Sequence, residues 1–575
     1  MLQVTRIACH YFSSLSHRVN MSKLLRRGLA SFARKTNVWT SEKVILSPYH
    51  DVEVPMTTVH EYVFSKLDKW PTKTAVVCGV TKRKYTYEEV YRLSKIFGAN
   101  LRSKFKIKDG DTVAIILPNS PEFPIAVYGT MTAGGIVTTM NPVYTPYELQ
   151  RQIDSSGAKL IVTHPDIVPN VKKALELAKK DIQIIAMNFE KPAPVGTISF
   201  KDLIDEVHID LTVLNEVKRS HEDVALLMYS SGTTGLPKPA ELSHFNVVAN
   251  CCQQDTELRQ YSYTTESHQD TTLVVLPMFH AYAFSLQMLH KMSAGLQLVT
   301  LPKFQPESFL NTLLNYKIDL MYLAPPMILY LGSYSEVKPK HLEHVKLMLS
   351  GAAPLPSADI QKMFDKAQRN FPFRQGYGMT EGGPLVTIMP TDIENYESVG
   401  YLLPNMKARV IDSHFNNLGP DEVGELLIKG PNVMKQYKDN PEANKESFVD
   451  GWYKTGDLAK VNDEGLVWIV DRLKELIKVK GFQVPPAELE AVIKEHPDVF
   501  DVAVMGIPDR VTGEAPKAFV ILKQGATVTD EQLISFVSNK VASYKKIKQV
   551  QFVDSIPKNP SGKILRKVLK EMYLN

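Results

Sequence analysis

The chain has 575 residues, which is too many for one hydrophobic core, so about two to four domains are expected. Hydrophobic residues make up 44% and charged residues 22%, as in ordinary globular proteins. The net charge of +5 arises in residues 1–41, which hold seven Lys or Arg and no acid; the rest has 60 basic and 62 acidic residues. The body therefore lacks the basic excess of nucleic-acid binders. Four cysteines without a C-x-x-C pair argue against a disulfide scaffold or a cysteine zinc site.

Residues 1–41 have the composition of a targeting leader. They carry arginine and serine, lack acids, and could form a basic amphipathic helix over 24–32. This composition is typical of a transit peptide and predicts the mitochondrion, with an untargeted basic tail and the cytoplasm as the alternative. The final residues, 572–575, are not a peroxisomal S-K-L signal.

Apolar runs alternate with helical patterns in the next part of the chain. Strands are expected at 112–117, 159–162 and 182–186, and helices at 147–155 and 171–179. This βαβ rhythm predicts parallel sheets covered by helices. The uncharged stretch 124–144 is long enough to be considered as a membrane span, but its glycines and threonines favour a buried helix, turn and strand. No transmembrane helix is expected.

The pattern changes twice toward the C-terminus. Short strands and turns predict a small β subdomain over about 405–471, which closes an N-terminal domain of residues 42–471. A boundary at 471–474 precedes a C-terminal domain, 472–575. In it we expect helices at 486–496 and 530–541 and strands at 502–506, 518–522 and 550–553. The predicted fold class is α/β: a large N-terminal domain of packed α/β subdomains with a small β subdomain, followed by a mobile, smaller α+β domain.

The segment 229–238, Tyr-Ser-Ser-Gly-Thr-Thr-Gly-Leu-Pro-Lys, is the most informative motif. Its glycines let backbone N–H groups converge, its hydroxyls add donors, and Lys238 adds a mobile charge. These features predict a loop that holds polyphosphate oxygens. It is not a Walker A loop, because Pro239 follows the lysine where Ser or Thr would hold Mg²⁺. The alternative is an ordinary Ser/Thr/Gly surface turn.

A second motif, residues 375–381, combines an aromatic ring with a carboxylate. Tyr377 lies between Gly376 and Gly378, so its ring could lie flat against a base. Thr380 offers a hydroxyl to phosphate, and Glu381 offers a hard oxygen to Mg²⁺. A glycine-rich turn with a packed tyrosine is the alternative.

Four further segments each indicate a ligand site only weakly when taken alone. The small residues of 350–355 would let a flat ligand approach the backbone, and Asp457 within 453–457 could accept both ribose hydroxyls. The cation-rich 471–483 would place Lys474, Lys478 and Lys480 on one face if extended. Segment 557–566 sets Lys563 on a flexible turn. Tight turns and solvated lysines would explain each of them equally well.

Together, these six segments, in this order and spacing, resemble the acyl- and aryl-activating adenylate-forming enzymes. The resemblance covers about residue 45 to the end and is closest to the 4-coumarate–CoA ligase-like branch. It implies an ATP-dependent acid–thiol ligase (an acyl-CoA synthetase) that uses ATP, coenzyme A and Mg²⁺ on a small-molecule carboxylic acid. The carboxylate attacks the ATP α-phosphorus and releases pyrophosphate; the coenzyme A thiolate then displaces AMP.

The resemblance also implies site residues. Lys563 would serve adenylate formation. Lys478 would serve thioester formation after the C-terminal domain turns about a hinge near Lys474. His280 would orient the carboxylate, and Thr380 and Glu381 would place phosphate and metal. Nucleotide and coenzyme A contacts would come from Ser230, Ser231, Gly232, Thr233, Thr234, Lys238, Ala353, Gln375, Gly376, Tyr377, Asp457, Arg472, Lys474, Lys480, Gly481 and Lys303.

The acid would lie against residues near Tyr282, Phe284, Leu286, Gly351, Gly376, Gly378, Pro384 and Val386. In the coumarate ligases a small polar residue stands at the position of Leu286. Leucine removes that polar handle and predicts a more apolar acid, a medium- or long-chain fatty acid first and an aromatic acid second.

The chain departs from the family pattern after Lys238, where it reads Pro239-Ala240-Glu241. Proline removes an N–H and glutamate adds negative charge, so ATP binding could be weakened. A luciferase-like oxygenase and a weakened nucleotide-binding protein therefore remain alternatives. A carrier-loading adenylation domain is disfavoured, because only twelve residues follow Lys563. The sequence does not indicate an oligomeric state.

Overall fold

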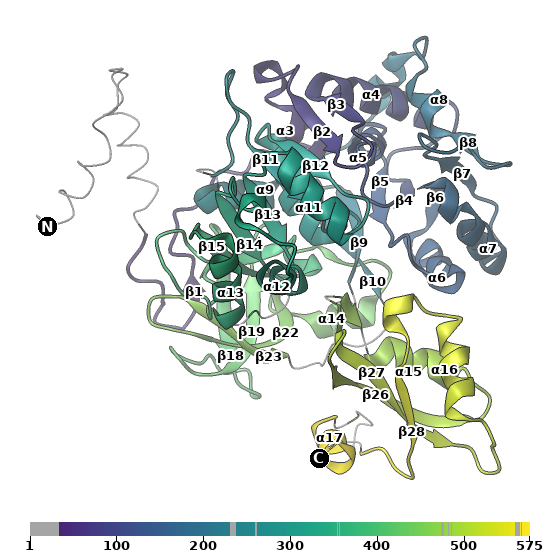
Figure 1. Ribbon diagram of the computed structural model, residues 1–575, viewed down its shortest axis with the longest axis vertical. Helices are drawn as coiled ribbons and strands as arrows, with labels where there is room; N and C mark the ends of the chain where they lie inside the picture. The colour runs from purple at the N-terminus through teal and green to yellow at the C-terminus, as the bar shows by residue number, and fades with distance from the viewer. Residues whose placement is uncertain are drawn as a thin grey trace, which may run out of the picture.

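The computed structural model describes residues 34–230, 237–258, 261–352, 355, 357–472, 477–480, 482–484, 486–557, 564 and 566–574. Most of the expected leader, residues 1–33, lies outside this set. Figure 1 shows a large body followed by a separate C-terminal unit, coloured yellow, which lies below it beside α14 and β10.

An eight-stranded sheet forms from the βαβ region in the order β20-β10-β9-β5-β4-β6-β7-β8. Its inner strands are parallel, and every residue of β4 is buried because both faces are covered. The strands are β4 (Thr112–Ile116), β5 (Ile136–Thr139), β6 (Ala158–Thr163), β7 (Gln183–Ala186), β8 (Ile198–Ser199), β9 (Val224–Ser230), β10 (Lys238–Ser243) and β20 (Gln436–Tyr437). The helices among them are α5 (Phe123–Thr132), α6 (Pro146–Ser156), α7 (Val168–Ala178) and α8 (Phe200–Ile204).

A nine-stranded sheet, β17-β16-β15-β14-β13-β11-β12-β2-β3, forms the second layer. Its strands are β2 (Thr74–Cys78), β3 (Lys84–Thr86), β11 (Thr271–Val274), β12 (Gln297–Thr300), β13 (Leu320–Leu323), β14 (Leu347–Ser350), β15 (Phe373–Gly378), β16 (Leu385–Ile388) and β17 (Tyr401–Leu402). Strands β2 and β11 to β15 run parallel.

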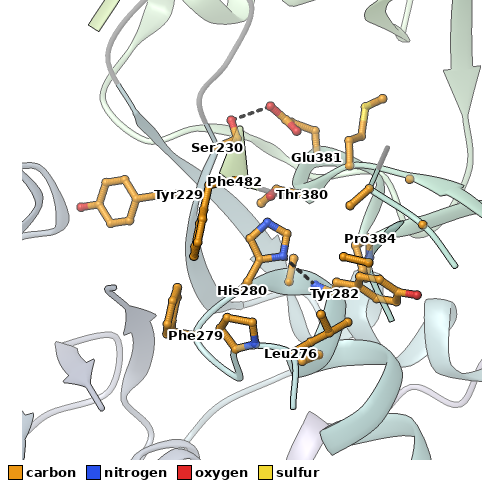
Figure 2. Close-up of a pocket in the computed structure, with 18 of the residues that line it drawn as sticks. Tyr229, Ser230, Leu276, Phe279, His280, Tyr282, Thr380, Glu381, Pro384 and Phe482 are labelled. Atoms are coloured by element: carbon orange, nitrogen blue, oxygen red, sulfur yellow. Dashed lines mark hydrogen bonds between the residues drawn. The ribbon is translucent and has the colours of Figure 1, made fainter. Parts of the chain in front are cut away.

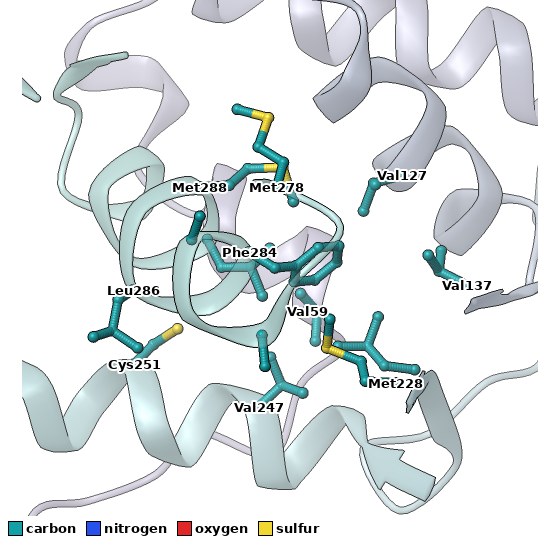
Figure 3. Packing of buried hydrophobic residues seen from close by; sticks show 14 of the residues in the cluster. Val59, Val127, Val137, Met228, Val247, Cys251, Met278, Phe284, Leu286 and Met288 are labelled. Atoms are coloured by element: carbon teal, nitrogen blue, oxygen red, sulfur yellow. The ribbon is translucent and has the colours of Figure 1, made fainter. Parts of the chain in front are cut away.

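Helices and apolar side chains fill the space between the two sheets. The main cluster includes Phe284, Val59 and Met228, which point toward one another in Figure 3. The remaining helices of the body are α3 (Val59–Phe64), α4 (Tyr87–Ser103), α9 (His244–Leu258), α10 (His290–Ser293), α11 (Pro306–Asn315), α12 (Pro325–Ser333), α13 (Ser357–Ala367) and α14 (Pro441–Ser447). A π-helix, η5 (Tyr282–Leu289), was not anticipated.

The small β subdomain is a six-stranded antiparallel sheet. Its strands are β1 (Ile45–Leu46), β18 (Lys407–Ile411), β19 (Gly424–Lys429), β21 (Phe448–Val449), β22 (Trp452–Val461) and β23 (Val467–Arg472). The N-terminal strand β1 pairs with β18, so the start of the described chain is tied to this subdomain.

The C-terminal unit has its own sheet and core. Its elements are β24 (Ile477–Val479), β25 (Phe482–Val484), α15 (Pro486–Lys494), β26 (Val499–Asp509), β27 (Gly513–Leu522), α16 (Asp530–Ser538), β28 (Gln549–Phe552) and α17 (Arg566–Tyr573). Val502 and Val504 face one apolar cluster, whereas Ala503 and Met505 face a second, because successive strand residues point to opposite faces.

The predicted fold class is confirmed: α/β layers with a β subdomain are followed by a smaller α+β unit. The mobility of that unit stays a prediction. One local expectation is wrong. The lysine-bearing strand ends at Val479, and Lys480 takes a left-handed turn conformation with φ 51°, so it does not extend the face of Lys478. No helix in the described part of the chain is long and apolar enough to cross a membrane.

Candidate active site

A cavity of about 280 Å³ lies where the carboxyl ends of strands from both large sheets meet. Ser230 ends β9, Gly351 follows β14 and Gly378 ends β15, and all three line the cavity. This is the edge at which parallel α/β sheets bind ligands. The C-terminal unit closes the cavity with Phe482, Glu488, Tyr544 and Lys545.

The predicted phosphate loop connects β9 to β10. Antiparallel pairing places Ser230 opposite Lys238, so the two ends of the loop lie side by side. Burial lowers the pKa of Lys238, and its ammonium lies 5.3 Å from the centre of the Tyr437 ring. The loop residues Ser231, Gly232, Thr233 and Thr234 lie outside the described residues.

Pro239 and Glu241 lie beyond this loop, inside β10. Pro239 pairs with Tyr229, and its carbonyl accepts a 2.9 Å hydrogen bond from the N–H of Lys438. Because the N–H and C=O of a strand residue point to the same side, the donor that proline lacks would face the short edge strand β20 and not β9. Glu241 accepts a 2.9 Å hydrogen bond from Gln436 and lies on the strand face opposite Lys238.

Glu381 lies at the centre of the polar half of the cavity. Its Oε1 accepts hydrogen bonds from the Ser230 hydroxyl at 2.6 Å and the Tyr437 hydroxyl at 2.5 Å. Figure 2 shows the first of these, with Thr380 on the same wall. No cluster of three His, Cys, Asp or Glu side chains forms a metal site in the described chain. A single carboxylate still fits Mg²⁺, which usually takes one or two carboxylates together with phosphate oxygens.

His280 projects into the middle of the cavity between Phe482 and Tyr282 (Figure 2). Its Nδ1 accepts a 3.3 Å hydrogen bond from the backbone N–H of Tyr282, which favours the neutral ring. His280 is exposed toward the cavity, yet the protein packed around the imidazole desolvates it and lowers its pKa.

Asp457 lines the cavity from β22 and lies opposite Arg472 of β23 in the pairing register. It accepts a 2.6 Å hydrogen bond from the Tyr377 hydroxyl. Gly376 and Gly378 line the cavity, whereas Gln375 and Tyr377 alternate to the other face of β15. The Gln375 amide donates to the backbone carbonyls of Leu355 and Tyr396. Neither side chain lines this cavity, and their predicted contact with the nucleotide stays a prediction.

The apolar half of the cavity is built on η5. Tyr282 and Leu286 line it, and the Tyr282 hydroxyl donates to the Leu349 carbonyl at 3.3 Å. Phe284 and Leu286 both belong to the core drawn in Figure 3, but only Leu286 also lines the cavity, so the predicted place of Phe284 at the acid is wrong. Val386 is also buried away from the cavity because Leu385 takes the cavity side of β16. The remaining apolar wall consists of Leu276, Pro277, Phe279, Ala281, Ala283, Ala324, Leu349, Gly351, Ala352, Met379 and Pro384.

Several predicted residues lie away from the cavity wall or outside the described chain. Lys478 is exposed on β24, Lys480 is exposed in the following turn, and Lys303 is exposed after β12. Lys474, Gly481, Ala353 and Lys563 lie outside the described residues. Ile564, next to Lys563, packs with the Ala503 and Met505 cluster, on the other sheet face from Val502 and Val504.

The sequence did not predict the residues that close the cavity: Tyr144, Phe482, Glu488, Tyr544 and Lys545. They come from distant segments and carry no shared local pattern. Glu488 and Lys545 are buried charges, which are rare unless paired, but burial cannot be read from their positions in the sequence.

Comparisons with known proteins show the family of the chain. A family model described as "AMP-binding enzyme" matches residues 63–438, and one described as "AMP-binding enzyme C-terminal domain" matches residues 488–563. The chain is 35% identical to 4-coumarate–CoA ligase 1 of Arabidopsis thaliana over 552 residues, covering 94% of this chain and 97% of the relative. It is 37% identical to 4-coumarate–CoA ligase 2 of Nicotiana tabacum, with 92% and 96% covered.

Among solved structures, a double mutant of o-succinylbenzoate CoA synthetase from Bacillus subtilis, bound to a product analogue, is 27% identical. It has a TM-score of 0.76 and covers 90% of this chain and 99% of its own. A malonyl-CoA ligase complex with methylmalonyl-CoA and AMP has 25% identity and a TM-score of 0.68, with 84% and 97% covered. The chain belongs to the AMP-binding, adenylate-forming enzyme family and is an acid–CoA ligase of the 4-coumarate–CoA ligase-like branch that uses ATP, coenzyme A and Mg²⁺.

Proposed function

We propose that this ligase activates a carboxylic acid with an apolar body, a medium- or long-chain fatty acid first. The observation that carries the proposal is Leu286 in the cavity wall, together with Tyr282, Ala324 and Leu349. An acid with a polar group at its far end would leave that group without a hydrogen-bond partner beside leucine, which is costly in a dry site.

The polar half of the cavity suits the triphosphate. Ser230, Lys238 and Thr380 would hold phosphate oxygens, and Glu381 would hold Mg²⁺, which when bound supplies positive charge against the triphosphate. Asp457 would accept the ribose hydroxyls, and neutral His280 lies between the polar and apolar walls, where the acid's carboxylate would be oriented.

Each of two lysines would serve one half-reaction. Lys563 would neutralise charge during attack on the α-phosphorus, and Lys478 would act when the thiolate displaces AMP. Lys563→Ala should abolish acid-dependent pyrophosphate release, with a loss of about a hundredfold or more. Lys478→Ala should leave that release intact and slow thioester formation from preformed adenylate. Normal adenylation by Lys563→Ala would refute the first assignment, and an unchanged thioester rate in Lys478→Ala would refute the second.

An acid panel tests the substrate class. Purified protein with ATP, Mg²⁺ and coenzyme A is offered saturated fatty acids of increasing length, cinnamate and 4-coumarate, and kcat/KM is compared. We expect fatty acids to exceed 4-coumarate by about tenfold or more, since a polar group facing an apolar pocket loses 1–3 kcal/mol or more. Strict preference for hydroxycinnamates would overturn the proposal.

An aromatic acid is the second candidate, because the curated relatives described above are named as 4-coumarate ligases. Cinnamate, which has the ring without the hydroxyl, separates the two candidates in the same panel. The acid-free leader supports a mitochondrial location. Fusing residues 1–41 to a fluorescent protein tests this, and diffuse cytoplasmic fluorescence would contradict it.

A further inference from the structure

Lys545 joins the C-terminal unit to the large body through buried ion pairs. Its ammonium lies 2.9 Å from Glu148 Oε1 in α6 of the body, and 2.9 and 3.0 Å from the two oxygens of Glu488 in α15 of its own unit. The side chains of Lys545, Glu148 and Glu488 are only 3%, 6% and 5% exposed. Burial alone would lower the pKa of Lys545, but Tyr144 and Glu488 outweigh it and raise that pKa well above its usual value.

Local structure fixes the Glu148 carboxylate for this contact. Thr145 caps α6: its N–H donates to Glu148 Oε2 at 2.9 Å, and its hydroxyl accepts from the Glu148 N–H at 3.4 Å. This capping box holds one carboxylate oxygen and leaves Oε1 directed at Lys545. The side chain is therefore preorganised before the C-terminal unit arrives, which lowers the entropy lost on contact.

The same short segment of the body makes the neighbouring contacts. The Thr145 hydroxyl also donates to the Lys540 carbonyl at 2.8 Å, and the Asn141 amide lies 3.4 Å from the Tyr544 hydroxyl. Tyr544 stacks on Phe482 with a centroid separation of 4.1 Å, and both rings line the cavity. Contact between Lys545 and Glu148 thus accompanies closure of the cavity by Phe482.

The C-terminal unit has two apolar clusters of its own and meets the body through polar contacts and through the rings of Tyr144 and Tyr147. Interfaces of this kind between domains permit relative motion by default. A buried charge pair that spans such an interface is costly to separate: Lys545 would keep Glu488, but the Glu148 carboxylate would lose its cation until water reached it. The position of the C-terminal unit should therefore depend strongly on the Lys545–Glu148 pair.

We propose that Lys545 is a positioning residue: by pairing with Glu148 across the interface while Glu488 holds it from behind, it keeps the C-terminal unit seated with Phe482 against the cavity. The proposal rests on the proposed function for its link to one half-reaction. In this orientation the hairpin that carries Lys478, the residue proposed for thioester formation, adjoins the cavity through Phe482. Ile564, which follows the proposed adenylation residue Lys563 in the sequence, packs on the opposite face of the β26–β27 sheet. The seated state therefore serves thioester formation and not adenylation.

The sharpest variant is Glu148→Gln. Glutamine keeps one acceptor oxygen, which can serve the capping box, but it places an NH2 donor where Oε1 met Lys545 and removes the charge that crosses the interface. We expect thioester formation from preformed adenylate to fall about tenfold or more, because truncating a buried charge pair has effects of this size or larger. Acid-dependent pyrophosphate release should stay within about twofold of wild type. Lys545→Met should behave likewise, and Lys545→Arg should retain more thioester activity than Lys545→Met.

Amide hydrogen exchange distinguishes a loss of positioning of the C-terminal unit from a loss of its folding. In Glu148→Gln, residues 141–148 and 482–484 should exchange faster while β26 and β27 keep their protection. Glu176→Gln, an exposed charge removal on α7, is the matched control and should change neither exchange nor either rate. Thioester formation within twofold of wild type in Glu148→Gln, an equal loss of both half-reactions, or deprotection of β26 and β27 would each overturn the proposal. If wild-type protein itself formed no thioester with any panel acid, the proposed function would fail instead.

Discussion

The Ser230 hydroxyl donates a 2.6 Å hydrogen bond to the Glu381 carboxylate, joining the end of β9 to the turn after β15. This contact brings the expected phosphate loop of one sheet to the expected metal ligand of the other, although 151 positions separate them in the chain. Both side chains are at least nine-tenths buried and line the cavity.

Replacing Glu381 with glutamine should nearly abolish the first half-reaction. Glutamine can still accept from Ser230 and Tyr437 but carries no charge for Mg²⁺, so pyrophosphate release should fall about a hundredfold or more. Pyrophosphate release across a Mg²⁺ titration is the measurement. Tyr437→Phe, which removes one hydrogen bond to the same oxygen without changing its charge, is the control and should cost less than tenfold. Equal losses in the two variants would contradict a metal role.

Replacing Pro239 with the glycine of the family pattern should have little effect on ATP binding. The proline lies in β10 with its missing donor turned toward β20, and Lys238 keeps its register opposite Ser230. We expect the KM for ATP of Pro239→Gly to stay within about twofold of wild type, with a small loss of stability from the freer backbone. A KM that falls tenfold would mean that the proline re-aims the loop.

Changing Leu286 should move substrate preference. Leu286→Ser removes apolar wall and adds a hydroxyl, so kcat/KM for a fatty acid should fall about tenfold to a hundredfold while 4-coumarate loses less or gains. Leu286→Ala controls for lost volume. Phe284→Ala, on the far side of η5, should cost about 3–5 kcal/mol of stability and leave the ratio between acids unchanged. A changed ratio in the Phe284 variant would show that η5 does not separate the two faces as described.

Buried histidine should make the protein lose stability in mild acid. Burial lowers the pKa of His244 to about 3, and its Nδ1 accepts a 3.0 Å hydrogen bond from the Val59 N–H. Unfolded histidine takes up a proton near its usual value of about 6.5, so below that pH the unfolded state binds more protons and stability falls. The loss reaches about 5 kcal/mol by the folded pKa.

Thermal unfolding between pH 7 and pH 4 checks this expectation. The midpoint of His244→Gln should fall less steeply with pH than that of wild type, because one site of proton uptake is removed. Parallel curves for the two proteins would show that His244 does not carry this pH dependence.

Part of this structure could be read from the chain. Strands such as β4 are continuous apolar runs, and glycine-rich segments with hydroxyls and a lysine or carboxylate mark several segments that reach the cavity. Phe284 was placed at the acid by the family resemblance, but residues two apart on a helix point to roughly opposite sides, so it does not share the cavity face of Tyr282. The sequence could not predict the contacts of Lys545 with Glu148 and Tyr144, because they depend on how two domains meet and no local pattern indicates that.

A structure with a non-hydrolysable acyl-adenylate analogue most directly tests whether this cavity is the reaction site. The sulfamate that replaces the phosphate should lie beside Ser230 and Thr380, the ribose beside Asp457, and the acyl chain against Leu286 and Tyr282. A nucleotide lodged outside these walls, or an acyl chain directed away from η5, would contradict the site and the specificity drawn from it.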